Sequence, residues 1–401
     1  MNVSRLLSDR VQQMEESATI RMAQRARDLN AQGIHVINLS VGEPDFDTPE
    51  NIKNAAKEAL DQGITHYTPV PGLMELRQAI AEKFKRDNGL EYKAQQIVVS
   101  NGAKQSIANV CLALLNPGDE VIIFSPFWVS NPEMVKMAEG VPVMVHAGIE
   151  QDFKVDPAQL EAAITDKTKM LLFSSPCNPT GSVYTRQELA AIAEVLEKHP
   201  DIVIVSDEIY EYINFGEKHF SIGSLPAMKD RTVTVNGFSK GFAMTGWRLG
   251  YIGAPGWLAE ACSKVQGQFT SGANAFSQKA AAHAILHEIS ACTAMRDVFL
   301  TRRDLFLDKL RTIPGLKVNQ PQGAFYVFPD VSTFFGKKYR DIQINDADDL
   351  SEYLLSEAHV SLVSGIPFGA PECIRMSYAN AEDEILEAAD RIKAALAKLE
   401  N

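Results

Sequence analysis

The sequence has few cysteines, and none of them stand at metal-binding spacing. Its 401 residues contain five cysteines, which are scattered along the chain without a CxxC pair. Because the number is odd and the chain is long, a disulfide framework is not expected and a reducing compartment is favoured. No group of cysteines and histidines has the spacing of a zinc site. We therefore expect neither structural disulfides nor a metal.

Long hydrophobic runs and clustered positive charge are also missing. No apolar run approaches the roughly 18 residues of a membrane-spanning helix, and residues 1–10 lack the apolar core of a signal peptide. The net charge is −12, which argues against nucleic acid or anionic membrane as a partner, since both need clustered Lys and Arg. We expect a soluble, cytoplasmic protein that binds neither.

The sequence does contain a regular alternation of strands and helices between residues 96 and 255. Apolar runs predict strands, and helical patterns lie between several of them; this arrangement is typical of a mostly parallel sheet covered by helices on both faces. Ligands bind such sheets at the carboxyl ends of the strands. The predicted strands are 96–100, 120–124, 141–146, 169–173, 202–206, 232–235 and 249–253, and the helices are 103–115, 129–139 and 186–198.

The two ends of the chain predict a second, smaller unit of the α+β class. A helical region over 276–312 is followed by short strands at 316–318, 324–328, 360–363 and 374–378, mixed with helices 346–357 and 382–399. At the other end come a helix over 4–31, a strand over 34–39 and a helix that Thr48 caps with Pro49 at its first position. We expect a large α/β domain over 48–290 and a small domain made of 1–47 plus 291–401.

One lysine and one arginine stand between two predicted buried strands. Lys240 and Arg248 are eight residues apart in a stretch of small and apolar residues, Asn236 to Tyr251. A desolvated lysine has a lowered pKa and can act as a nucleophile or base, and an arginine there would bind an anion. The alternative is a solvated loop with two ordinary surface charges.

Three further stretches carry polar residues at the ends of predicted strands. Residues 100–105 predict the end of a strand, a turn of small residues and the start of a helix. The free N–H groups of such a helix start can form an anion-binding cradle; the alternative is a plain turn. Asp207 ends an apolar strand, where it would hold a cationic ring nitrogen or cap a helix, and Tyr210 follows as a site residue or a core aromatic. Asn178 lies in a turn that two prolines and a glycine make rigid.

Arg375 alternates with apolar residues in a short strand, where it is either an edge-strand charge or a carboxylate clamp. Together these residues supply a lysine nucleophile, an anion cradle, a buried acid, an Asn/Tyr pair and a second arginine. The set matches a cofactor with an aldehyde, a phosphate, a basic ring nitrogen and a phenolic oxygen. Pyridoxal 5′-phosphate has all four groups.

Six ordered motifs resemble the class I/II aminotransferases, which are fold-type I pyridoxal-phosphate enzymes, and most resemble their bacterial aspartate aminotransferase subgroup. The motifs span most of the chain: 38–46, 67–72, 177–181, 206–210, 239–250 and 375–378. The resemblance implies a mostly parallel, seven-stranded-type sheet flanked by helices, with a smaller α+β domain made of both termini. It also implies ping-pong amino-group transfer through a Schiff base on Lys240.

For catalysis, the resemblance implies that Lys240, once released from the cofactor, carries the proton between the substrate Cα and the cofactor C4′. Asp207 would pair with the ring nitrogen and keep it protonated, while Tyr210 and Asn178 bind the ring oxygen.

For cofactor binding, the resemblance implies that Trp128 stacks on the ring. Tyr67 would reach the phosphate of the neighbouring subunit, which implies a homodimer with shared active sites. The phosphate of the same subunit would be held by Gly102, Ala103, Lys104, Ser239 and Arg248.

For the substrate, the resemblance implies that Arg375 binds the α-carboxylate, with Asn178, Trp128 and the Gly42 backbone beside it. A lysine at the position of Lys104, with Ser17 and Thr19, is associated with the distal carboxylate of a dicarboxylic substrate. The expected reaction is therefore aspartate plus 2-oxoglutarate giving oxaloacetate plus glutamate. Lys104 would otherwise lie solvated on a helix surface.

The sequence departs from the family pattern at three places. Gly237 stands where many members have a serine that contacts the phosphate, Cys177 replaces an asparagine, and Glu15 and Glu16 precede the segment thought to line the substrate entrance.

Aromatic amino acids or prephenate remain alternative substrates. A C–S lyase or a decarboxylase would share the same motifs. A cofactor-binding regulator is disfavoured because no basic segment is present, and a nicotinamide dehydrogenase because no GxGxxG follows a strand.

Overall fold

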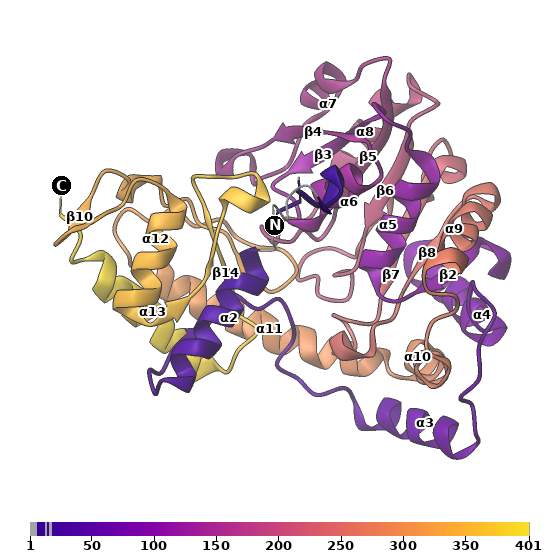
Figure 1. Ribbon diagram of the computed structural model, residues 1–401, viewed down its shortest axis with the longest axis horizontal. Helices are drawn as coiled ribbons and strands as arrows, with labels where there is room; N and C mark the ends of the chain where they lie inside the picture. The colour runs from indigo at the N-terminus through magenta and orange to yellow at the C-terminus, as the bar shows by residue number, and fades with distance from the viewer. Residues whose placement is uncertain (1–5, 13, 16–17, 401) are drawn as a thin grey trace.

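The computed structural model describes residues 6–12, 14–15 and 18–400. A large sheet with its helices forms one part of the molecule, and the C-terminal helices and short sheets form the other (Figure 1). The long helix α11 (Ile289–Leu310) runs between them. None of the helices in these described ranges is long and apolar enough to cross a membrane.

The large sheet has seven strands in the order β2-β8-β7-β6-β5-β3-β4. Four neighbouring pairs are parallel, while β8 runs antiparallel to both β2 and β7. This confirms the predicted mostly parallel sheet, and it brings the segment that joins β7 to β8 to the edge where the parallel strands end. The strands are β2 (Ile97–Ser100), β3 (Glu120–Ser125), β4 (Val141–His146), β5 (Thr168–Ser174), β6 (Val203–Asp207), β7 (Thr232–Gly237) and β8 (Gly250–Gly253).

Helices cover both faces of this sheet because its inner strands are apolar on both sides. In β3, Val121 and Ile123 pack with the helices of one face, whereas Ile122 and Phe124 pack with those of the other; this alternation is the two-residue period of a strand. The first face carries α5 (Ala103–Leu114), α6 (Ser130–Met137) and α9 (Gly256–Phe269). The second carries α3 (Glu50–Asp61), α4 (Met74–Lys83), α7 (Pro157–Ala163), α8 (Arg186–Glu197) and α10 (Ala275–His287).

The second part is built on one large apolar core. A three-stranded sheet, β13-β14-β9, and a parallel pair, β1-β12, pack with α11 and with the C-terminal helices. Since β1 pairs with β12, residues 37–38 join the C-terminal part. The domain boundaries at 48 and 290 stay a prediction. The elements are β1 (Ile37–Asn38), β9 (Tyr326–Val327), β12 (Val360–Ser361), β13 (Val363–Ser364), β14 (Ile374–Ser377), α12 (Ala347–Tyr353) and α13 (Glu382–Leu396), with a small hairpin of β10 (Lys338–Tyr339) and β11 (Ile342–Gln343).

Several local predictions are wrong. Within the helix expected over 4–31, the structure has two helices, α1 (Asp9–Gln12) and α2 (Ala18–Ala31). No residue of α1 is buried, so no packing stabilises a continuous helix there. Thr48 does not cap α3, because its hydroxyl donates to the Ala243 carbonyl and Pro49 is the N-cap. The strand expected over 316–318 is absent from the described residues, where only Lys317 forms a single bridge. Helices α4, α7 and α9 were not predicted.

Candidate active site

A cavity of about 300 Å³ opens at the carboxyl ends of the parallel strands. It brings together most of the residues that the sequence singled out. Its walls are formed by Thr19, Ile20, Gly42, Ala103, Lys104, Trp128, Ser130, Ser174, Asn178, Asp207, Ile209, Tyr210, Ser239, Lys240, Thr245, Arg248, Tyr326 and Arg375. Predicted residues from eight separate stretches of the chain therefore meet at one place.

Lys240 reaches the cavity from the segment that links β7 to β8. Its Nζ donates a hydrogen bond to the Gly42 carbonyl. Burial lowers the pKa of Lys240 to about 8, although Glu43 opposes this shift, and the nearby Arg375 and Arg248 charges lower it further. A lysine with this pKa has a usable free amine close to neutral pH, as nucleophilic catalysis requires. The alternative of a solvated surface charge is excluded for this residue.

Asp207 is the last residue of β6 and is 5% exposed. Its Oδ1 accepts the Ile209 amide at 3.2 Å, so it closes a turn instead of capping a helix. Burial raises the pKa of Asp207 to about 7; the Glu208 charge adds to this shift, while the Ile209 amide and the Lys240 charge oppose it. A buried carboxyl of this kind is stabilised in its ionised form by a cation placed against it.

Arg375 lies fully inside the protein, on the central strand of its three-stranded sheet, so it is not an edge-strand charge. Its Nη1 donates to Asn178 Oδ1 at 2.9 Å and its Nη2 to the Ser40 carbonyl at 2.6 Å. Its Nε finds no partner among the described residues. Because all five N–H groups of an arginine can donate, this guanidinium still has donors to offer to a carboxylate in the cavity.

Tyr210 faces the cavity, and its hydroxyl lies 2.8 Å from the hydroxyl of Tyr326. The ring of Tyr326 in turn lies 4.6 Å from the Arg375 guanidinium carbon. Sequence reasoning missed Tyr326, which sits in a short apolar strand 116 residues after Tyr210. It also missed the cavity residues Ser174 and Thr245. For Tyr326, the only available signal was the hydroxyl group of an aromatic residue within a predicted buried strand.

The predicted anion cradle lies at the start of α5. Gly102 is the N-cap of this helix with φ 85°, and a Cβ there would come within 2.5 Å of Arg248 Nη2. Glycine suits this position, because other residues rarely adopt this φ and a Cβ would displace the Arg248 guanidinium. The first amides of a helix have no partner within the helix and attract anions. Ser239 and Arg248 line the same cavity.

Lys104 does not lie on an open helix surface. Its Nζ is 4.8 Å from the centre of the Trp128 ring, and both side chains face the cavity. Burial lowers the pKa of Lys104, and the Arg248 charge adds to this effect. The side chain therefore adds a further cation to the cavity, besides Arg248 and Arg375.

Four of the predicted residues, Tyr67, Gly102, Gly237 and Glu15, are not among the residues that line the cavity. Tyr67 is 99% exposed and lies outside the cavity lining. Gly237 pairs with Gly250 in the sheet, and a Cβ on it would come within 2.9 Å of the Leu249 carbonyl, so a serine does not fit here. Ser239 occupies the cavity wall instead. Glu15 borders a neighbouring pocket that shares Lys104, while Glu16 and Ser17 lie outside the described residues.

Pyridoxal phosphate fits the residues of this cavity. The buried Asp207 carboxyl suits a cationic ring nitrogen, and the start of α5 with Arg248 beside it suits a phosphate. The lowered pKa of Lys240 suits condensation with an aldehyde. The free Nε of Arg375 suits an amino-acid carboxylate. These four features satisfy four different groups of one cofactor–substrate pair.

Known proteins of similar sequence are aminotransferases. The chain is 48% identical over 395 residues (97% of this chain, 82% of the relative) to a bifunctional aspartate aminotransferase and glutamate/aspartate-prephenate aminotransferase of Petunia hybrida. It is 47% identical over 396 residues (98% and 99%) to an aspartate/prephenate aminotransferase of Cereibacter sphaeroides.

Solved structures of aminotransferases have the same fold. The aspartate aminotransferase of Rhizobium meliloti superimposes with a TM-score of 0.95 at 40% identity, covering 98% of this chain and 99% of that one. The Thermus thermophilus enzyme with maleate gives 0.92 at 42% identity, covering 97% and 99%. The model of aminotransferase classes I and II matches residues 34–392, and the protein therefore belongs to this family of pyridoxal-phosphate enzymes.

Proposed function

We propose that this protein transfers an amino group between aspartate and 2-oxoglutarate in a ping-pong reaction, with pyridoxal phosphate held by Lys240. The observation that carries the choice of substrate is that two cationic side chains line the cavity besides those assigned to the cofactor, Lys240 and Arg248; these two are Arg375 and Lys104. A dicarboxylic substrate can pair each carboxylate with one of them, which favours it over a neutral amino acid. The relatives named aspartate aminotransferases support this choice.

Bound pyridoxal phosphate supplies an aldehyde that condenses with amines and a protonated ring that accepts the electron pair left at the substrate Cα. In this proposal Asp207 pairs with the ring nitrogen, while Tyr210 and Asn178 donate to the ring oxygen. Trp128 packs on the ring. The amides of Gly102, Ala103 and Lys104 bind the phosphate together with Ser239 and Arg248.

Two residues act directly on the substrate. Arg375 orients the α-carboxylate, with Asn178, Trp128 and the Gly42 backbone beside it. The Lys240 amine would take the Cα proton and carry it at Nζ. Because Nζ already donates to the Gly42 carbonyl, the amine is held inside the cavity and away from bulk water.

Two features concern the assembled protein in the cell. We propose a homodimer in which Tyr67 reaches the phosphate of the neighbouring subunit; a tyrosine side chain that is 99% exposed supports this role, because an aromatic ring rarely stays fully in water. We also propose that the protein is cytoplasmic. Its five cysteines are all free thiols, and four of them are buried, as in proteins of reducing compartments.

A second candidate substrate is prephenate. Relatives at 47% and 45% identity are named aspartate/prephenate and probable aspartate/prephenate aminotransferase. Prephenate also carries two carboxylates, so the Arg375 and Lys104 pair suits it as well. An acceptor panel that includes prephenate beside 2-oxoglutarate separates the two.

Substituting Lys104 with alanine tests the substrate proposal. We expect kcat/KM for aspartate to fall by about 10- to 100-fold, because one charge-assisted contact to the distal carboxylate is lost. For alanine and phenylalanine as amino donors, kcat/KM should change by less than about threefold. Lys264→Ala, on the exposed side of α9, is the matched control. An equal loss for all three donors would contradict the proposal.

The pKa of Lys240 predicts how cofactor binding depends on pH. The rate at which the cofactor-free protein condenses with pyridoxal phosphate should rise through a pH of about 8. The reason is that burial lowers the pKa of this amine, so the reactive free form appears above about 8 and is lost as the pH falls. Stopped-flow absorbance between about pH 6 and pH 10 measures this rate. A midpoint near the ordinary lysine value would show that Lys240 is not the reacting amine.

A further inference from the structure

The turn that carries Asp207 and Tyr210 has two acidic residues on its other side. Asp207 and Tyr210 line the cavity, whereas Glu208 and Glu211 point away from it. Glu208 is 1% exposed and Glu211 is 7% exposed. Two carboxylates so close together inside a protein are costly unless donors or cations surround them.

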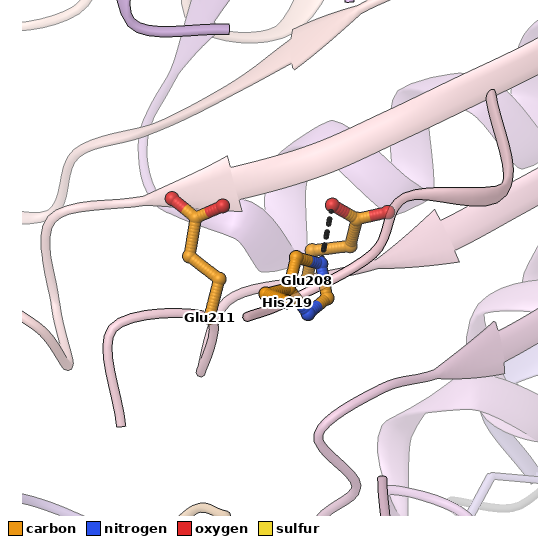
Figure 2. A group of neighbouring side chains, drawn as sticks. All are labelled: Glu208, Glu211 and His219. Carbon is orange, nitrogen blue, oxygen red and sulfur yellow. Dashed lines mark hydrogen bonds and ion pairs between the residues drawn. The ribbon is translucent and has the colours of Figure 1, made fainter. Parts of the chain in front are cut away.

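Side chains from two other segments surround Glu208. Its Oε2 lies 2.8 Å from His219 Nε2 and accepts the Ser221 hydroxyl at 2.5 Å, and Asn88 Nδ2 is 3.4 Å away. Figure 2 shows the His219 ring in contact with the Glu208 carboxylate. Its other oxygen, Oε1, accepts the Ser206 hydroxyl at 3.0 Å.

Glu211 is held by the end of α4 and the turn that follows it. The fully buried Lys83 ammonium pairs with Glu211 Oε1 and donates to Asn88 Oδ1 at 2.8 Å. Asn88 Nδ2 donates to Glu211 Oε2 at 2.7 Å. Asn88 therefore links both glutamates to the lysine. Glu208, Glu211 and His219 could share a metal ion by distance, but the Lys83 ammonium already provides the positive charge against Glu211.

We propose that Lys83, Asn88 and His219 are positioning residues for the cofactor ring. They contact Glu208 and Glu211 on the side of the 207–211 turn that faces away from the cavity. By holding this turn in place, they fix Asp207 against the ring nitrogen. This inference rests on the proposed function, because it requires that Asp207 binds the cofactor. The three residues touch neither the cavity nor the reacting atoms.

The charges around the turn support this role. Glu208 raises the pKa of its neighbour Asp207, while Lys240 lowers it. Burial by itself would lower the pKa of His219, but the Glu208 carboxylate outweighs burial and raises it, with Glu211 adding to this and Lys83 opposing it. On the side away from the cavity, Glu208 therefore has His219 and Ser221 against it, and Glu211 has Lys83 and Asn88.

The test compares pyridoxal phosphate with its analogue in which a C–H group replaces the ring nitrogen. Full-length, cofactor-free protein is titrated with each compound, and the two Kd values are measured by absorbance for the unchanged protein and for His219→Gln and Asn88→Ala. We expect both variants to bind pyridoxal phosphate roughly five- to tenfold more weakly and the analogue within about twofold of the unchanged protein. The ratio of the analogue's Kd to that of pyridoxal phosphate should therefore fall in both variants.

The pair His199 and Glu161 supplies the matched control, because it joins the same two residue types at 3.5 Å, between the segment that follows α8 and helix α7. His199→Gln should leave both Kd values unchanged. If His219→Gln and Asn88→Ala weaken both compounds by the same factor, or neither, the inference is overturned. If Asn88→Ala does not fold, His219→Gln decides alone. If the unchanged protein itself binds no pyridoxal phosphate, the proposed function fails instead.

Discussion

Replacing Lys240 with alanine is expected to lower kcat for aspartate transamination by about 10⁴-fold, the largest effect of any single change in this protein. The substitution removes both the amine that condenses with the cofactor and the base that moves the Cα proton. No described neighbour can take over, since the Lys104 amine packs over Trp128 on another part of the wall. Single-turnover absorbance with aspartate measures the step directly.

The controls for Lys240→Ala must separate chemistry from binding. Bound cofactor is quantified first, so that the rate is expressed per loaded site. Lys264→Ala, which removes an exposed lysine from α9, should keep the unchanged rate. If Lys240→Ala turns over within about tenfold of the unchanged protein, Lys240 is not the residue that moves the proton.

The second large effect is expected for Asp207→Asn, which should lower kcat by about 10³-fold. The side chain keeps its shape and loses its charge, so the ring nitrogen is no longer held protonated and the ring becomes a poor electron acceptor. Burial raises the pKa of Asp207 to about 7, and a cation against it lowers this value and keeps the carboxylate ionised. The half-reaction with aspartate and the Kd for pyridoxal phosphate are the two measurements.

Asp201→Asn is the matched control for this change. Asp201 is exposed and precedes the same strand at its opposite end, far from the cavity. It should behave like the unchanged protein in both measurements. If Asp207→Asn raises the Kd for pyridoxal phosphate but leaves kcat at saturating cofactor unchanged, Asp207 only anchors the ring and does not tune its chemistry.

The strands of the large sheet could be predicted because most of them are runs of apolar residues, several rich in Val and Ile. β4 has the predicted bounds, and β6 differs by one residue at each end. The N-terminal helix was overpredicted because Leu6, Leu7 and Val11 follow a helical pattern but remain exposed. Periodicity reports which residues could be buried together, whereas burial also requires a surface to pack against.

The direct contacts of the cavity could also be predicted in part, since Lys240, Asp207, Asn178 and Arg375 each interrupt an apolar or rigid stretch with a group that needs a partner. Tyr326 could not be predicted, because its hydroxyl meets Tyr210 across 116 residues of chain. Thr48 had two possible partners, and its hydroxyl bonds to the Ala243 carbonyl instead of capping α3. A local motif cannot reveal which distant group competes for a side chain.

The sequence alone therefore determined the strands of the large sheet, some of the helices on its faces and the types of side chain found at the strand ends, because apolar patterning and motif spacing are local properties. Only the tertiary structure decided how the charges are paired. Lys104 and Arg375 face one cavity, and Glu208 and Glu211 turn away to Lys83, Asn88 and His219. Pairing depends on which segments pack together, and buried charges are stable only where packing brings a partner within hydrogen-bond distance.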